Sequence, residues 1–224
     1  MNRRQSFLKR AVGIGMVFSV VVGVGYPKVS LAEPTKAEEP HNNVVVNSTV
    51  QRDNIVERYV QWACIIADND VHGYSQGAVN ATASRPYTGS REGPDYDCSS
   101  LVYHALDYAG IPIIAAWQKN PAYYDLYQGQ QETGDADTIW QDLQKIGGFK
   151  KYKWDEVKNS LQRGDILCNP DTHVAIYIGD GKTVEARGVN NPRGGAWRTG
   201  DQGGEIDYYN AQGRGWTEVY RHIE

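Results

Sequence analysis

Cysteine is scarce in this sequence of 224 residues, which contains three cysteines and five histidines. Three is an odd number, so at least one thiol stays unpaired whatever disulfides form. Close pairs of metal-ligand type, such as C-x-x-C or H-x-x-x-H, do not occur. We therefore expect no zinc site.

Long apolar segments are missing as well. The longest apolar run, residues 11–25, has 15 residues, whereas about 20 are needed to span a bilayer. Four basic residues precede this run, and Ser30-Leu31-Ala32 follows it as a small-x-small cleavage site. The pattern predicts a signal peptide over residues 1–32, secretion to the cell exterior or cell wall, and no stable membrane insertion.

Basic residues are fewer than acidic residues once that segment is removed. Residues 1–32 hold five of the 23 Lys and Arg residues and none of the 27 Asp and Glu, so the remaining 192 residues carry a net charge of −9. This balance argues against nucleic acid or an anionic lipid surface as a partner. The remaining length suits one domain, which we expect to be a monomer.

The apolar pattern predicts the organisation of that domain. Residues 33–52 are rich in Pro, Asn, Thr and charge and predict a flexible linker before a domain over residues 53–224. Helices are expected from Asp53, which would cap the first, at 98–109, at 137–146 and at 155–161. Strands of an antiparallel sheet are expected at 166–168, 173–178, 183–186 and 217–222. Helices followed by strands predict the α+β fold class.

Cys98 lies where a polar turn, Pro94 to Asp97, gives way to helical apolar spacing. Unpaired N–H groups and the positive end of the helix dipole stabilise a thiolate there, so we expect a lowered pKa and a nucleophilic role. Cys64 and Cys168 have apolar neighbours in a helix and a strand. We expect them to be buried free thiols, with a disulfide between them as the alternative.

A thiol nucleophile needs a base, and His173 is the best placed histidine. It opens a predicted strand that returns through Gly-Asp-Gly towards Glu185. Of the other histidines, His41 lies in the predicted linker and His72 in a loop. His104 is rotated by about 600° around the helix from Cys98, which points it away from the thiol. His222 lies near the C terminus.

The turn between these two strands decides whether His173 has a partner. A two-residue turn would put Glu185 on the opposite face of the sheet from His173. A three-residue turn over residues 179–181 would pair Ala175 with Glu185 and bring Glu185 to the His173 face, one diagonal step away. The sequence leaves both registers open: Glu185 either orients the imidazole or is a solvated carboxylate.

Three segments around these residues resemble the NlpC family of papain-like cell-wall cysteine hydrolases, closest to the subgroup of phage endolysins and Gram-positive secreted enzymes. They are PDYDCSSLV at 94–102, GDIL at 164–167 and HVAIYIGDG at 173–181. Weaker similarity lies at 62–63, 72–76 and 199–202. The resemblance therefore covers the chain from about Ile55 to its end.

The resemblance implies a papain-like α+β fold with Cys98 as the nucleophile and His173 as the base. The family's third catalytic position, 12 residues after the base, is usually His, Asn or Gln, and here it is Glu185. Asp97 and Ser99 are implied as contacts to the stem peptide.

A pocket tyrosine is also implied by the resemblance. Tyr74 matches it by local sequence and Tyr87 by spacing, with an insertion of residues from about 77 to 90 between them. We prefer Tyr74.

The activity implied by the resemblance is hydrolysis of an amide bond in peptidoglycan stem peptides, without metal or organic cofactor. We expect cleavage between D-γ-glutamate and the diamino acid, with the bond between muramic acid and L-alanine as the alternative. Two other interpretations are a non-catalytic wall-binding protein and a secreted toxin or lysin aimed at other cells.

Overall fold

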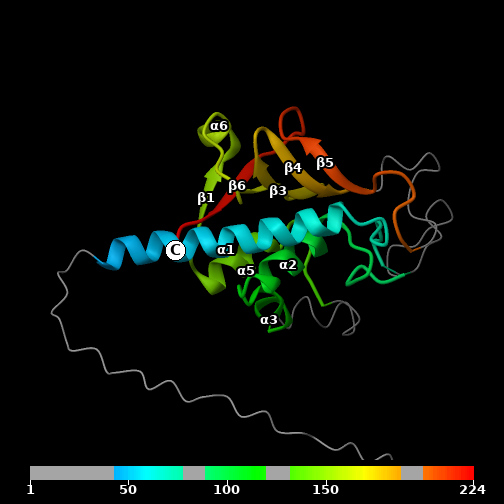
Figure 1. Ribbon diagram of the computed structural model, residues 1–224, viewed down its shortest axis with the longest axis horizontal. Helices are drawn as coiled ribbons and strands as arrows, with labels where there is room; N and C mark the ends of the chain where they lie inside the picture. The colour runs from blue at the N-terminus through cyan, green and yellow to red at the C-terminus, as the bar shows by residue number, and fades with distance from the viewer. Residues whose placement is uncertain (1–42, 78–88, 120–131, 188–198) are drawn as a thin grey trace, which may run out of the picture. The chain divides into compact units, whose positions relative to one another are not determined.

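A six-stranded antiparallel sheet and the helices on one of its faces form the frame of the protein (Figure 1). The computed structural model describes residues 43–77, 89–119, 132–187 and 199–224, which belong to one unit, Pro40–Glu224. The helices are α1 (Asn43–Ala67), α2 (Cys98–Tyr108), α3 (Ile113–Gln118), α5 (Ile139–Ile146) and α6 (Trp154–Val157). The strands are β1 (Phe149–Lys153), β2 (Ile166–Asn169), β3 (His173–Gly179), β4 (Lys182–Ala186), β5 (Ile206–Asn210) and β6 (Glu218–His222), in the sheet order β1-β6-β2-β3-β4-β5.

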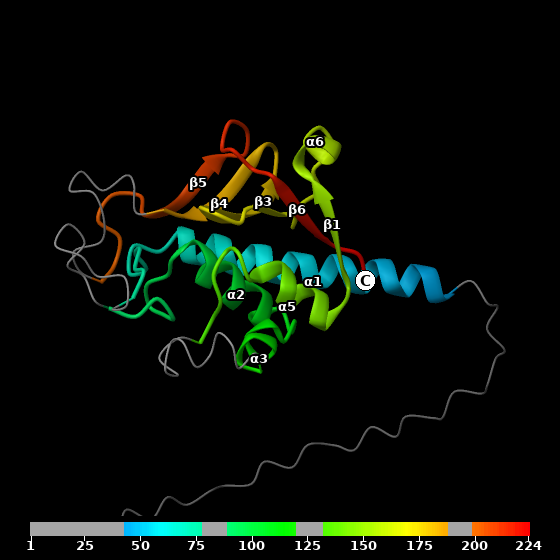
Figure 2. The ribbon, with the colours of Figure 1, turned by 180° about the vertical axis from the view of Figure 1, so that it is seen from behind.

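The two faces of the sheet have separate apolar cores. Alternate residues of the central strands pack against α1 and α2, among them Ile166, Cys168, Val174, Ile176 and Val184. The residues between them form a second cluster with α6, made up of Val157, Leu167, Ala175, Tyr177, Ala211, Trp216 and Val219. Figures 1 and 2 agree that α1, α2, α3 and α5 lie on one side of the strands and α6 lies apart from them. The α+β class predicted from the sequence is confirmed.

Helix α1 is longer than predicted. It begins at Asn43, so the last ten residues of the segment predicted as a flexible linker, 43–52, are helical, and Asp53 is not its cap. No glycine or proline stands between Asn43 and Ala67, and extending an existing helix costs little free energy. Residues recurring every three or four positions are buried against the sheet and α2: Val56, Tyr59, Val60, Ala63 and Ile66.

The expected helix at Cys98 and the strands around His173 are present, but three elements were not predicted. These are α3, β1 and β5. The predicted helix at 155–161 is the shorter α6, which ends at Val157. The predicted signal peptide lies outside the described residues. Among the helices of the described part, none is long and apolar enough to cross a membrane.

Candidate active site

Asp97 fixes the start of α2 and thereby the position of Cys98. The Asp97 carboxylate accepts the backbone N–H of Ser100 over 2.8 Å, and the Ser100 hydroxyl interacts in return with the backbone N–H of Asp97 over 2.9 Å. This reciprocal capping box satisfies donors that the first helical turn leaves unpaired. Cys98 is consequently the first residue of the helix, as the sequence predicted.

The sulfur of Cys98 lies against the beginning of β3. The backbone N–H groups of Val174 and Ser99 are directed at it. Because Val174 follows His173 directly, the nucleophile lies at the same end of β3 as the predicted base. Burial and the charge of Asp97 nevertheless raise the pKa of the Cys98 thiol to about 12. The predicted lowering of this pKa is therefore wrong, since these two effects outweigh the helix terminus.

Strands β3 and β4 have the register that was predicted for a three-residue turn, since Ile176 pairs with Val184 and Tyr177 with Thr183. The turn itself has two residues, Asp180 and Gly181, because Gly179 pairs with Lys182 and an irregularity between Tyr177 and Gly179 shifts the register by one residue. Glu185 accordingly reaches His173: the Nε2–Oε2 distance is 2.8 Å. The interpretation of Glu185 as a solvated carboxylate is wrong, because its side chain is completely buried.

Glu185 is a charged group held by several donors. Burial would raise its pKa, but hydrogen bonds from His173 and Thr183 and the charges of His173 and Arg187 outweigh that effect and lower the pKa below its ordinary value. The Thr183 hydroxyl donates to Oε1 over 2.6 Å, and Nη1 of Arg187 lies 3.3 Å from Oε2. An ionised carboxylate only accepts hydrogen bonds, so the Nε2 of His173 carries the proton.

The His173 ring is fixed on a second side by Trp216. Their ring centroids lie 5.6 Å apart with an interplanar angle of 17°, a stacked arrangement. The other ring nitrogen, Nδ1, has no hydrogen bond within the described part of the chain. With the proton on Nε2, Nδ1 is the basic nitrogen, and it is the one available to take a proton from a thiol.

An open cavity of about 390 Å³ lies beside the sulfur. Asp97, Cys98 and Ser99 line one side of it, and residues 135–137 and 170–172 line others. Among the described residues, the 72–76 segment contributes Gln76 to the lining rather than Tyr74, which is 8% exposed and belongs to the core. Tyr87, the other candidate for the pocket tyrosine, lies outside the described residues.

The acceptors predicted to contact substrate are already occupied by Arg91, a residue that the sequence did not single out. Arg91 donates through Nε and Nη2 to the two carboxylate oxygens of Asp97, over 2.6 and 2.8 Å, and through Nη2 to the Ser99 hydroxyl over 2.7 Å. A single arginine in a loop rich in glycine and serine carries no periodic signal. Only the folded chain reveals this contact.

Two of the three weaker segments of the family resemblance, 72–76 and 199–202, meet at Asp95. Oδ1 of Asp95 accepts the backbone N–H of Gly73 over 2.8 Å and that of Gly200 over 2.9 Å. The approach is so close that a Cβ on Gly73 would lie 2.2 Å from the Gly200 oxygen. Segments 72–76 and 199–202 therefore hold Asp95, which lies in the turn before Cys98, in place.

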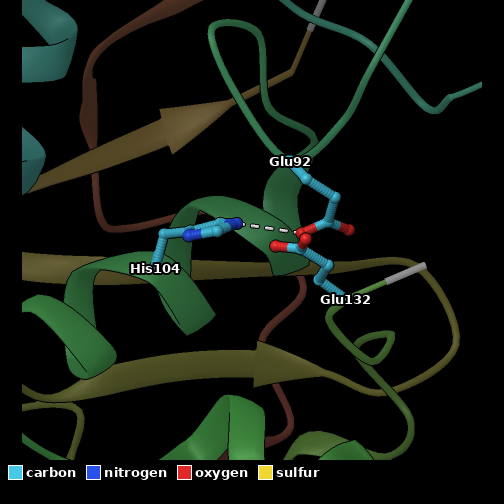
Figure 3. A group of neighbouring side chains, drawn as sticks. All are labelled: Glu92, His104 and Glu132. Carbon is cyan, nitrogen blue, oxygen red and sulfur yellow. Dashed lines mark hydrogen bonds and ion pairs between the residues drawn. The ribbon is translucent and has the colours of Figure 1, made fainter. Parts of the chain in front are cut away.

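One group of side chains has the composition of a cation site. Glu92, His104 and Glu132 bring their ligand atoms within 4.8 Å of one another (Figure 3). His104 Nε2 is however already 2.9 Å from a Glu92 oxygen, and the Thr133 hydroxyl donates to the other oxygen of Glu92. These contacts account for Glu92, which is held by His104 of α2 and by Thr133.

Cys64, Cys168, His72 and His222 do not belong to this site, and His41 lies outside the described residues. All three cysteines are free, so the alternative of a Cys64–Cys168 disulfide is not realised. His72 binds the Pro94 carbonyl and His222 packs edge-on against Phe149. None of these four side chains lines the cavity within the described residues.

The fold and the site together define the class of protein to which this chain belongs. Helices packed on an antiparallel sheet, with a cysteine opening a helix beside a strand histidine, make a papain-like α+β protein. The endolysin-like domain family matches residues 39–184, well over half of the chain. The chain belongs to the endolysin-like domain family, which confirms the resemblance found in the sequence.

Similar solved structures include mycobacterial ones. A variant of the Resuscitation Promoting Factor Interacting protein RipA has 19% identity and a TM-score of 0.43, over 80% of this chain and 65% of its own. The peptidoglycan hydrolase RipB from Mycobacterium tuberculosis has 17% identity and a TM-score of 0.40, over 80% and 68%. The P60 domain of an antigen from M. avium subspecies paratuberculosis has 14% identity and a TM-score of 0.42, over 80% and 98%. No curated protein matches the chain.

Proposed function

We propose that the protein is a secreted peptidoglycan hydrolase that cleaves an amide bond of the stem peptide with the Cys98 thiol. The observation that carries this proposal is the 2.8 Å contact of His173 with the buried Glu185, at the strand end where the Cys98 sulfur meets the Val174 N–H. A solvated surface histidine would have no need of a buried carboxylate. Membership in the endolysin-like domain family supports a cell-wall substrate.

The reaction begins with a protonated thiol, because the pKa of Cys98 is raised. His173 takes the proton on Nδ1 as the sulfur attacks the carbonyl carbon, and Glu185 stabilises the imidazolium that forms. In the first turn of α2, the Ser100 N–H is bound to the Asp97 carboxylate and the Leu101 N–H to the Asp97 carbonyl. The Cys98 N–H is therefore the donor that we expect to bind the developing oxyanion. The imidazolium then protonates the leaving amine, which leaves a thioester on the sulfur.

Water completes the cycle. His173 removes a proton from a water molecule, the resulting hydroxide attacks the thioester, and the thiol is regenerated by the same proton. Every proton is accounted for by His173 and water, and the chemistry requires no metal or organic cofactor.

Within this function we propose the D-γ-glutamyl to diamino acid bond as the target, with the bond between muramic acid and L-alanine as its rival. Digestion of purified peptidoglycan followed by mass spectrometry separates them. The first reaction leaves L-alanyl-D-glutamate on the glycan, whereas the second leaves a glycan free of peptide. Cys98→Ala is the inactive control. If this variant releases fragments as fast as the wild type, the catalytic proposal is wrong and a wall-binding role takes its place.

A further inference from the structure

Glu185 is in contact with two arginines besides His173. Nη1 of Arg187 lies 3.3 Å from Oε2, the oxygen that also accepts from His173, and Nε of Arg214 lies 3.9 Å from Oε1. The two arginine side chains are 23% and 26% exposed, whereas the carboxylate has no exposed area. Two partly exposed cations therefore contact one buried anion.

The ring of Tyr209 holds both guanidinium groups next to Glu185. Its centroid lies 5.3 Å from Cζ of Arg187 and 4.9 Å from Cζ of Arg214, distances at which a cation is attracted to an aromatic ring. Tyr209 pairs with Thr183 in the register of β4 and β5. The sheet therefore places the two arginines, in addition to the attraction of the carboxylate.

The charges around Glu185 come from several parts of the chain. The described ionisable groups that contact it or lie beside it in the sheet are His173 of β3, Arg187 after β4, Asp207 and Tyr209 of β5, and Arg214 before β6. Burial raises the pKa of Tyr209 to about 12, so this phenol is neutral. The two carboxylates and the two guanidinium groups balance in charge, and the imidazole stands beside a neutral set.

This balance bears on the requirement that a base be unprotonated before it acts. The Cys98 thiol is protonated in the free enzyme because its pKa is raised, so the reaction needs a neutral imidazole to accept the proton. A buried carboxylate 2.8 Å away would by itself favour the imidazolium form of His173. The two guanidinium groups oppose that effect, because they repel the imidazolium and share the charge of the carboxylate.

We propose that Arg187 and Arg214 are positioning residues that offset the charge of Glu185, so that this carboxylate orients His173 without keeping it protonated at neutral pH. The inference rests on the proposed function and adds what sets the pH range of the same site. Neither arginine lines the cavity within the described residues, so both act through Glu185. Orientation of the imidazole requires the carboxylate, and its basicity requires the cations.

The test is the pH dependence of kcat/KM on soluble muropeptides. The acid limb of this profile reports the protonation of the essential base in the free enzyme. We expect Arg187→Met to move the midpoint of the limb up by about one pH unit, and Arg214→Met by about half a unit because Arg214 lies farther from the carboxylate. At about pH 9 both variants should stay within about threefold of the wild-type rate. All proteins meet the same substrate at each pH, so titration of the substrate cancels in the ratio.

Two further variants separate charge from structure. Arg187→Lys keeps a cation and should recover about half of the shift or more, which a loss of packing would not allow. Arg221→Met is the matched control, because Arg221 also pairs with a buried carboxylate, Asp165, and lies 5.1 Å from a tyrosine ring. Arg221 has no contact with Glu185 or His173 in the described part of the chain. Its substitution should leave the midpoint of the limb unchanged.

A double variant serves if the single variants do not fold. Arg187→Met combined with Glu185→Gln removes the cation and the anion together and leaves no uncompensated buried carboxylate. Compared with Glu185→Gln alone, the double variant should still have its acid limb about one pH unit higher, because a cation beside the imidazole is gone.

The possible failures are distinguishable. An acid limb that stays in place or moves to lower pH in the arginine variants overturns the inference and leaves the proposed function standing. Loss of activity by the same factor at every pH assigns the arginines a structural role only, which also overturns it. If the wild type releases no more fragments than Cys98→Ala at any pH, the proposed function and the inference fail together.

Discussion

His173 donates a hydrogen bond through Nε2 to Oε2 of Glu185 over 2.8 Å, and the carboxylate is completely buried. The contact sets the tautomer of the imidazole, so Nδ1 is the nitrogen that can act as a base. A carboxylate at this position also stabilises the imidazolium ion, which an amide cannot do to the same degree. The two parts of this role, orientation and charge, can be separated by substitution.

Glu185→Gln keeps a carbonyl oxygen for Nε2 and removes the charge. We expect kcat to fall about tenfold, and Glu185→Ala, which removes both, to lower it by about 10² to 10³. KM should change little, since Glu185 does not line the cavity within the described residues. Asp180→Asn, at the exposed turn of the same hairpin, is the matched control and should keep wild-type rates. Equal kcat for Glu185→Ala and wild type would contradict the role of Glu185.

Alkylation of Cys98 reports the state of its thiol in the free enzyme. Because the pKa of Cys98 is raised to about 12, inactivation by iodoacetamide should be slow at neutral pH. Its rate should rise about tenfold per pH unit up to about pH 10, whereas glutathione levels off above a pKa near 9. The modified residue is identified by peptide mass spectrometry, which distinguishes it from Cys64. A plateau below about pH 7 would instead indicate a preformed thiolate.

The sequence predicted those parts of the site that depend on local pattern. Cys98 could be placed at a helix start because a polar turn meets apolar 3.6-residue spacing there. The hairpin could be reduced to two registers because Gly179 and Gly181 permit only a few turns. The structure then selected the register that joins His173 to Glu185.

The parts that were missed depend on contacts between distant segments. Arg91 has no periodic neighbours, and its partners at Thr133 and Gly134 are more than 40 residues away. Strand β5 has one buried residue followed by partly buried ones, and β1 has three lysines, so neither shows the alternation expected of a strand. The pKa of Cys98 was predicted from the helix terminus alone, because burial cannot be read from sequence.

The Asp97–Arg91 pair should make a measurable contribution to stability. Asp97→Asn keeps a good helix cap but removes the nearest of the charges that compensate a buried guanidinium, since Glu92 and Asp135 lie farther from it, at 3.5 and 3.6 Å. We expect a loss of about 3–5 kcal/mol in the free energy of unfolding at pH 7, or about 6 to 20 °C in Tm for a domain of this size. Asp171→Asn, an exposed carboxylate in the same cavity, should shift Tm by less than about 2 °C.

This contribution should depend on pH in a defined direction. Burial opposes the charged form of Asp97, but Arg91 and the hydrogen bonds from Ser100 and Ser99 lower its pKa below the ordinary value. The stabilisation is therefore complete above about pH 4 and is lost as the pH falls through the lower pKa of the folded state. Melting curves of wild type and Asp97→Asn should converge towards pH 2. A Tm difference that stayed constant with pH would contradict an electrostatic origin.

Two glycines with nearly the same φ angle allow the cost of backbone strain to be measured apart from the cost of steric overlap. Gly164 has a φ of +90° and Gly110 a φ of +94°, and both angles are unfavourable for alanine. A Cβ on Gly110 would meet no atom within 4 Å, whereas a Cβ on Gly164 would lie 2.3 Å from the Tyr59 hydroxyl, which donates to the Gly164 carbonyl over 2.7 Å.

We expect Gly110→Ala to cost about 1–2 kcal/mol of unfolding free energy from strain alone. Gly164→Ala should cost about 2 kcal/mol more, because Val56 and Tyr59 must both move and Tyr59 must give up its hydrogen bond between α1 and the segment before β2. The double variant Gly164→Ala with Tyr59→Phe removes the clashing hydroxyl and should recover part of that difference. Urea denaturation of the wild type and the three variants measures the free energy of unfolding of each protein. Equal losses for the two glycine variants would show that the Tyr59 hydrogen bond to Gly164 does not hold α1 in place.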